Sequence, residues 1–112
     1  MDDHPSRLIA QHALAMVYQT DGQVEKAAEL LEHVVAVRKK VQVEWHPPRL
    51  ASEHALAVAY QANAQVGNAL KLLEHVVAIK AKVLRGDHPS RLISQQALAG
   101  LNKESRASSE AG

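Results

Sequence analysis

His-Pro-Ser-Arg-Leu stands at residues 4–8 and again at 88–92, and His-Pro-Pro-Arg-Leu stands between them at 46–50. The offset is 42 residues in both cases. When residues 4–45 are aligned with residues 46–87, 22 of the 42 positions are identical. Self-similarity at a fixed period of this size is the signature of a repeat protein, in which each unit stacks on the next. The chain therefore contains two full units and a half unit that begins at His88.

Each unit predicts a pair of antiparallel helices. The proline at the second position of each copy suits the first residue of a helix, where a missing N–H costs nothing and φ is preset. Apolar residues then recur at helical spacing on either side of a turn, Asp21-Gly22 in the first unit and Asn63-Ala64 in the second. We expect positive φ at Gly22. In the second turn we expect Asn63 to take the left-handed conformation, because that conformation is costly for alanine.

This pattern predicts an all-α fold, a right-handed solenoid of about five antiparallel helices with no strand. The second helix of each unit carries two apolar stripes and so has two neighbours, its own partner and the next unit. The expected helices span residues 5–20, 23–43, 48–62, 65–85 and 89–102. The repeat array would cover residues 4–102, in units 4–45, 46–87 and 88–102, and the polar residues 103–112 would form a disordered tail.

Composition excludes several classes of protein. The chain has 112 residues, which suggests one domain, and its net charge of +1 does not fit a strongly basic nucleic-acid-binding protein. The absence of cysteine excludes disulfides, thiolate metal sites and a cysteine nucleophile. The longest apolar run, residues 55–60, is far shorter than the roughly 20 residues that span a bilayer. We expect a cytoplasmic protein with no nucleic-acid or membrane partner.

The residues at these spacings resemble the tetratricopeptide repeat (TPR) family. The first unit has Leu14-Ala15-x-x-Tyr18 and then Ala27-x-x-x-Leu31-x-x-Val34, and the second unit repeats this pattern 42 residues later. The long period, with His-Pro at the joint and a prolonged second helix, resembles the kinesin-light-chain type of TPR. The near-identical copies resemble the TPR arrays of fungal NB-ARC signalling ATPases.

The resemblance implies a concave groove lined by the first helix of each unit. Such a strip would mix apolar and hydrogen-bonding side chains, and it would suit an extended peptide or a partner helix. Kinesin light chains present an asparagine pair just before Leu-Ala, where this chain has His12-Ala13 and His54-Ala55. A solvated, unoccupied groove is the alternative. The expected partner-binding residues are Ile9, His12, Met16, Gln19, Ala51, His54, Val58, Gln61 and Gln96.

The seven histidines are best explained by duplication of the unit. Six of them form three pairs that are related by the repeat, no two lie four residues apart on one helix, and no HExxH motif occurs. Equivalent residues of stacked repeats lie roughly 10 Å apart, which is too far for a shared zinc ion. We therefore expect no metal and no cofactor. A pH-sensitive partner surface is the alternative interpretation.

The remaining candidate residues have structural explanations. Arg38-Lys39-Lys40 is interpreted as a solvated helix end, with a phosphate-binding patch as the alternative. Trp45 either packs over the loop between units or anchors a partner. The serines Ser6, Ser52 and Ser90, and the acids, are expected on helix surfaces. Since no Gly-rich phosphate loop, nucleophile elbow or spaced pair of carboxylates occurs, we expect no enzymatic activity.

Two functions remain. The first is a protein–protein interaction module whose groove binds a peptide or a helix of a protein partner. The alternative is a structural or regulatory repeat segment of a larger NB-ARC-type signalling ATPase, which would act by self-association through the ends of the repeat array.

Overall fold

Five helices make up the described part of the chain. The computed structural model describes residues 4–111, with side chains for all of these except Pro5 and residues 108–111. The predicted all-α class is confirmed, and the described residues contain no strand. The helices are α1 (Pro5–Thr20), α2 (Val24–Val41), α3 (Pro47–Ala62), α4 (Val66–Val83) and α5 (Pro89–Ala111).

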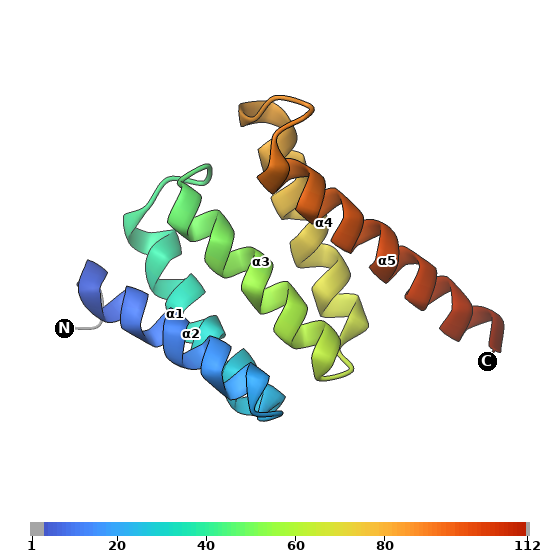
Figure 1. Cartoon of the computed structure of the whole chain (residues 1–112), viewed down its shortest axis with the longest axis horizontal. Helices are drawn as coiled ribbons and strands as arrows, with labels where there is room; N and C mark the ends of the chain where they lie inside the picture. The colour runs from blue at the N-terminus through green and yellow to red at the C-terminus, as the bar shows by residue number, and fades with distance from the viewer. Residues whose placement is uncertain (1–3, 112) are drawn as a thin grey trace.

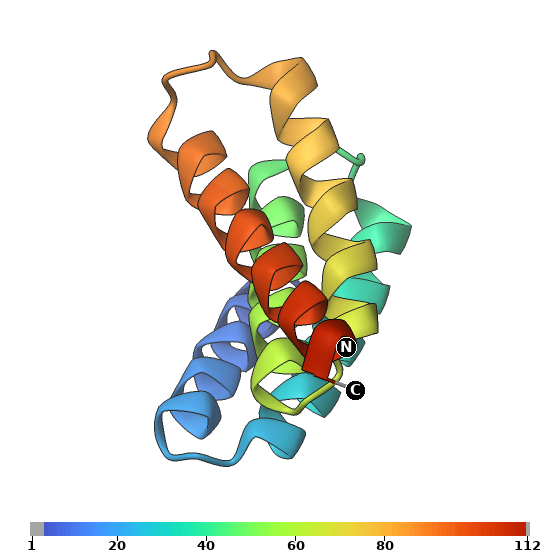
Figure 2. The same ribbon diagram turned by 90° about the vertical axis from the view of Figure 1, so that its right-hand side faces the viewer.

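The helices lie in two layers. In one layer α1, α3 and α5 run side by side, and α2 and α4 form the other (Figure 1, Figure 2). Each helix packs chiefly against the helices before and after it in the chain, and the array measures 46 × 34 × 21 Å. Contacts therefore stay local, as in solenoids whose repeats touch only their neighbours. No helix among the described residues is long and apolar enough to cross a membrane.

The histidine at the start of each copy precedes a helix, and in two of the three copies its side chain caps that helix. In the first and third copies its Nδ1 accepts a hydrogen bond from the backbone N–H two residues later, that of Ser6 (3.2 Å) and that of Ser90 (3.1 Å). In the second copy this residue is Pro48, which has no N–H. Nδ1 of His46 is consequently buried without a hydrogen-bond partner. One serine-to-proline difference between the copies thus removes a helix cap.

The two turns between paired helices have the same backbone shape but different residues. Gly22 has φ of 80°, as predicted. The prediction for the second turn was wrong: Ala64 has φ of 62°, whereas Asn63 has φ of −92°. In both turns the left-handed residue is the second after the helix end. The same backbone hydrogen bond closes both turns, from Gln23 N–H to Tyr18 O in the first unit and from Gln65 N–H to Tyr60 O in the second. Alanine therefore occupies a conformation that its Cβ disfavours.

Two clusters of buried side chains form the core. Leu31 is fully buried in the cluster that joins α1, α2 and α3, and Leu73 is buried in the cluster that joins α3, α4 and α5. Alanines with no exposed surface, such as Ala15, Ala57 and Ala69, let the helices approach closely. Leu101 of α5 completes the second cluster, so the half unit covers the far side of α4.

Helix α5 continues to Ala111, nine residues beyond its expected end at residue 102. The expectation of a disordered tail from Lys103 disagrees with this helix, and residue 112 lies outside the described residues. In the first two copies the helix stops at Asp21-Gly22 and Asn63-Ala64, but the third copy has Ser105 and Arg106 there, with no glycine, asparagine or aspartate. Nothing in the sequence ends the helix at this point, and polar composition alone does not prevent helix formation.

The left-handed alanine gives a stability prediction. Ala64→Gly should raise the free energy of unfolding by about 0.5–1 kcal/mol, because relief of about 1–2 kcal/mol of strain exceeds the extra freedom of the unfolded chain. Urea titration followed by circular dichroism would measure the change.

The matching turn in the first unit supplies the control. Gly22→Ala should destabilise the chain by a similar amount, and steric collision is not the reason, since a Cβ added there meets no atom within 4 Å. A loss of stability in Ala64→Gly would contradict the left-handed assignment.

Candidate functional site

A groove of about 860 Å³ opens on the layer formed by α1, α3 and α5. Its walls come from the end of α1, the first three turns of α3 and the start of α5. None of its side chains is an acid, a lysine or an arginine. The groove is lined by Met16, Gln19, Thr20, Ala51, His54, Ala55, Val58, His88, Pro89, Ser90 and Ile93.

Five of the nine residues proposed from the sequence lie in this groove: Met16, Gln19, Ala51, His54 and Val58. The other four lie outside it. Ile9 is 64% exposed on α1, and Gln96 is exposed on α5. Gln61 donates a hydrogen bond from Nε2 to Glu104 Oε2 of the prolonged α5, at 2.8 Å. His12 makes its hydrogen bond to α3 instead.

Sequence reasoning missed the contribution of the third copy. His88, Pro89, Ser90 and Ile93 line part of the groove, because the start of α5 approaches α3. The His-Pro-Ser motif marked the joint between units. Its proximity to the middle of α3 depends on the angle between units, which periodicity does not reveal.

A smaller cavity of about 310 Å³ continues from the groove and shares Ala51, His88 and Ser90 with it. Trp45 lines this cavity together with Pro47, Val83 and Leu84, among others. The indole nevertheless remains 56% exposed. Trp45 thus packs over the joint with part of its ring and leaves the rest open to solvent.

Two histidines bridge successive units. His12 Nδ1 of α1 lies 3.0 Å from Ser52 Oγ of α3, and His54 Nδ1 of α3 lies 2.9 Å from Ser94 Oγ of α5. Both serines have no exposed surface. The prediction that Ser52 lies on a helix surface was wrong, because this face of α3 packs against α1 and α2.

A buried cation accompanies each of these pairs. Arg38 of α2 and Lys80 of α4 are only 4% and 6% exposed. Lys80 Nζ donates to Ser94 Oγ at 2.8 Å and to Ser90 O at 3.3 Å. The prediction of a solvated helix end was therefore wrong at Arg38, whose stem is covered by the neighbouring helices, although Lys39 and Lys40 are exposed.

These surroundings change the proton affinity of the bridging histidines. Burial lowers the pKa of His12 and of His54, and the nearby positive charge, Arg38 for His12 and Lys80 for His54, lowers it further. Both imidazoles are therefore neutral at physiological pH.

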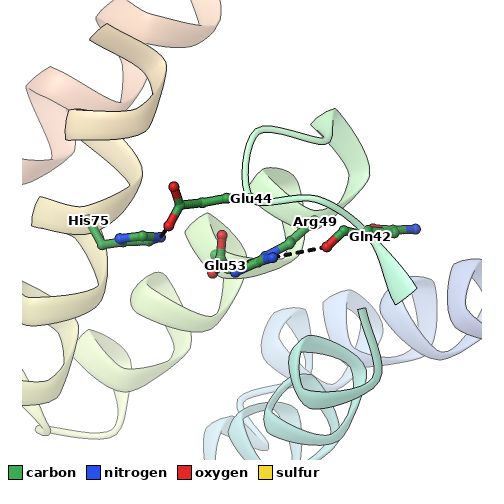
Figure 3. A network of polar contacts seen from close by, with 5 residues as sticks. All are labelled: Gln42, Glu44, Arg49, Glu53 and His75. Atoms are coloured by element: carbon green, nitrogen blue, oxygen red, sulfur yellow. Dashed lines mark hydrogen bonds and ion pairs between the residues drawn. The ribbon is translucent and has the colours of Figure 1, made fainter. Parts of the chain in front are cut away.

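Another cavity, which is lined largely by polar side chains and has a volume of about 580 Å³, lies between α2, α3 and α4. Glu53 has no exposed surface here, and neither of its oxygens has a hydrogen-bond partner. Arg49 Nε lies 3.8 Å from Glu53 Oε2, while its Nη1 donates to Gln42 O at 3.0 Å (Figure 3). His75 Nε2 lies 3.8 Å from Glu44 Oε2 beside them.

The acid at Glu53 was expected on the helix surface, and this prediction was wrong because α2 and α4 both cover that side of α3. Burial raises the pKa of Glu53, and Glu44 raises it further, although Arg49, His75 and Lys39 act in the opposite direction. The first and third copies carry glutamine at this position, Gln11 and Gln95. The second unit thus has a buried carboxylate where its sister units have an uncharged amide.

The chain belongs to the tetratricopeptide repeat family, which matches residues 7–41 and 49–90. Two crystal structures of nearly identical, kinesin-light-chain-like TPR repeats from Podospora anserina are similar to it. One shows 56% identity over 99% of this chain, with a TM-score of 0.92. The other, a variant with one glutamine replaced by methionine, shows 57% identity over 90% of this chain, with a TM-score of 0.88.

The chain spans about half the length of these structures, 53% of the first and 48% of the second. A comparison with curated proteins found no significant match.

Acidification should destabilise the chain. An unfolded histidine binds a proton near pH 6.5, whereas folded His12 and His54 do so only at lower pH. The unfolded state therefore binds more protons below pH 6.5, and stability falls as the pH drops from there towards the folded pKa values. We expect a lower melting temperature at about pH 5.5 than at about pH 7.5, and a smaller difference in a His12→Gln/His54→Gln double variant.

The raised pKa of Glu53 makes the fold more stable as the pH falls, which opposes the effect of the two histidines. These melting curves are therefore best compared in a Glu53→Gln background. An unchanged pH dependence in the double variant would contradict the role of the two histidines.

The buried carboxylate gives a separate prediction. Glu53→Gln, which restores the residue of the other two copies, should raise the free energy of unfolding at neutral pH, because it removes a buried charge that has no hydrogen-bond partner. The gain should vanish towards pH 4.5, because a group with a raised pKa in the fold is protonated there and no longer opposes folding. Glu74→Gln on the exposed side of α4 is the control and should change little. Destabilisation by Glu53→Gln would mean that the ion pair with Arg49 outweighs the cost of burial.

Proposed function

We propose that this chain is a non-catalytic protein-interaction scaffold that binds a peptide in the groove between α1, α3 and α5. The observation that carries the proposal is the groove itself, about 860 Å³ in volume, with mainly apolar walls and uncharged polar side chains at intervals. Ligand sites in proteins combine these two features. Membership of the TPR family supports a scaffolding role.

The groove offers apolar anchors at separate points. Met16 belongs to α1, Val58 to α3 and Ile93 to α5, so a bound segment would contact three successive helices of the layer. Ile93 is 58% exposed in the free chain and could bury further apolar surface on binding. At about 25 cal/mol per Å² of buried apolar surface, a few such contacts contribute substantially to affinity.

A second candidate function, self-stacking of repeat arrays, is favoured by one observation. Leu14 and Val17 of α1 are 44% and 62% exposed, while their counterparts Leu56 and Ala59 of α3 are buried against α2. The outer face of α1 thus has the pattern of a face that covers another unit. The alternative role as a repeat segment of a larger NB-ARC-type signalling ATPase would use this face, and sedimentation of Leu14→Glu beside the parent chain would test it.

The groove predicts where a peptide binds. Random linear peptides selected on the immobilised chain should lose at least about tenfold in affinity towards Ile93→Glu, because a charge replaces an apolar anchor. Fluorescence polarisation would measure the dissociation constants.

The control is Val43→Glu, the same change of chemistry at a residue 52% exposed in the loop between α2 and α3. This variant should bind the peptides like the parent chain. Equal loss in both variants, or binding that survives in Ile93→Glu, would place the binding surface elsewhere.

A further inference from the structure

The hydrogen bonds behind the groove have a definite direction. The ammonium group of Lys80 is a donor, and it donates to Ser94 Oγ at 2.8 Å. Ser94 Oγ has one proton of its own, and among its partners only Nδ1 of His54 can accept it, at 2.9 Å. A protonated Nδ1 could also donate to Ser94 Oγ, but the proton of this buried hydroxyl would then have no acceptor. The arrangement that satisfies every group leaves Nδ1 of neutral His54 unprotonated and places the ring proton on Nε2.

A second histidine of the groove reaches the same state by another route. Nδ1 of His88 accepts the backbone N–H of Ser90 at 3.1 Å. Because a backbone N–H can only donate, Nδ1 of His88 carries no proton and its neutral ring also has the proton on Nε2. His54 and His88 both line the groove. In each ring the nitrogen left for a ligand is a donor.

We propose that the contacts on Nδ1 turn His54 and His88 into fixed hydrogen-bond donors of the groove, which select an extended peptide segment with free carbonyl oxygens over a helix. This inference rests on the proposed function of the groove. The groove has no acidic side chain that would compete for these donors. Lys80, Ser94 and the backbone N–H of Ser90 act as positioning groups, since they hold the two rings in place.

The preference for an extended segment follows from backbone hydrogen bonding. In a helix each carbonyl oxygen accepts an N–H four residues later, except in the last turn. In an extended segment the carbonyl oxygens remain free. Hydrogen-bond donors placed among apolar anchors therefore bind an extended backbone more tightly than a helical one. Proteins that bind peptides as an added strand also gain affinity from main-chain hydrogen bonds.

The first unit contains the same residues outside the groove. His12 pairs with Ser52 as His54 pairs with Ser94, and His4 accepts from Ser6 N–H as His88 accepts from Ser90 N–H. Neither His12 nor His4 lines the groove. The chain thus supplies a matched control for each proposed donor.

The first experiment uses the full chain without any peptide. Nitrogen–proton correlation spectra of isotope-labelled protein at about pH 7.5 distinguish a protonated from an unprotonated ring nitrogen. We expect His54 and His88 to have the proton on Nε2, and Lys80→Met or Ser94→Ala to release His54 into a mixture of tautomers. Ser52→Ala should affect His12 and leave His54 unchanged. A proton on Nδ1 of His54 or of His88 in the parent chain would overturn the proposal.

The second experiment uses the linear peptides selected on the chain. His54→Phe and His88→Phe should each lower their affinity about fivefold, the value of one hydrogen bond, whereas His12→Phe and His4→Phe should leave it unchanged. Peptides stiffened into helices with α-aminoisobutyrate should bind more weakly than the linear ones. Equal effects of groove and control variants, or tighter binding of the helical peptides, would refute donor selection and leave the scaffold function standing. If no peptide is selected, the scaffold function itself fails, while the spectra still decide the tautomers.

Discussion

Stacking of each unit on the next is the constraint on which the whole structure depends. Neither helix pair encloses a core by itself, because the second helix of each unit is apolar on two sides. Leu31 shares its buried cluster with residues of α3, and Leu73 shares its buried cluster with Leu101 of α5. Since buried alanines bring the helices close together, small changes at these junctions affect the whole array. The half unit is therefore as much a part of the core as the two full units.

The junctions between units also contain polar groups that recur in successive copies. His12 with Ser52, and His54 with Ser94, join first helices of successive units, and a buried cation of the intervening helix lies beside each pair. Buried polar groups that find partners fix one arrangement of neighbouring helices, because any other arrangement leaves them unsatisfied. Both carboxylate oxygens of Glu53 lack such a partner. Its copies are glutamines, and its charge is buried without a hydrogen bond.

Some differences between the copies change the local structure. Pro48 removes a helix cap that the other copies keep, and Ala64 adopts a backbone conformation that Gly22 adopts without strain. The third copy lacks a turn signal, so α5 runs on and Glu104 pairs with Gln61. It also supplies His88 and Ile93 to the groove. The groove is thus a property of the junction between copies, not of one copy.

The sequence by itself determined the five helices, the starts of α1, α3 and α5 at or next to prolines, the positive φ of Gly22 and the solenoid class, because these follow from local rules and from the period. It also indicated five of the residues that line the groove. Only the tertiary structure decided that His12 bonds to Ser52, that Arg38 and Glu53 are buried, and that the start of α5 lines the groove. The partners of both bridging histidines lie 40 residues away. These contacts depend on the angle between stacked units. Side-chain packing sets this angle, and the period of the sequence does not predict it.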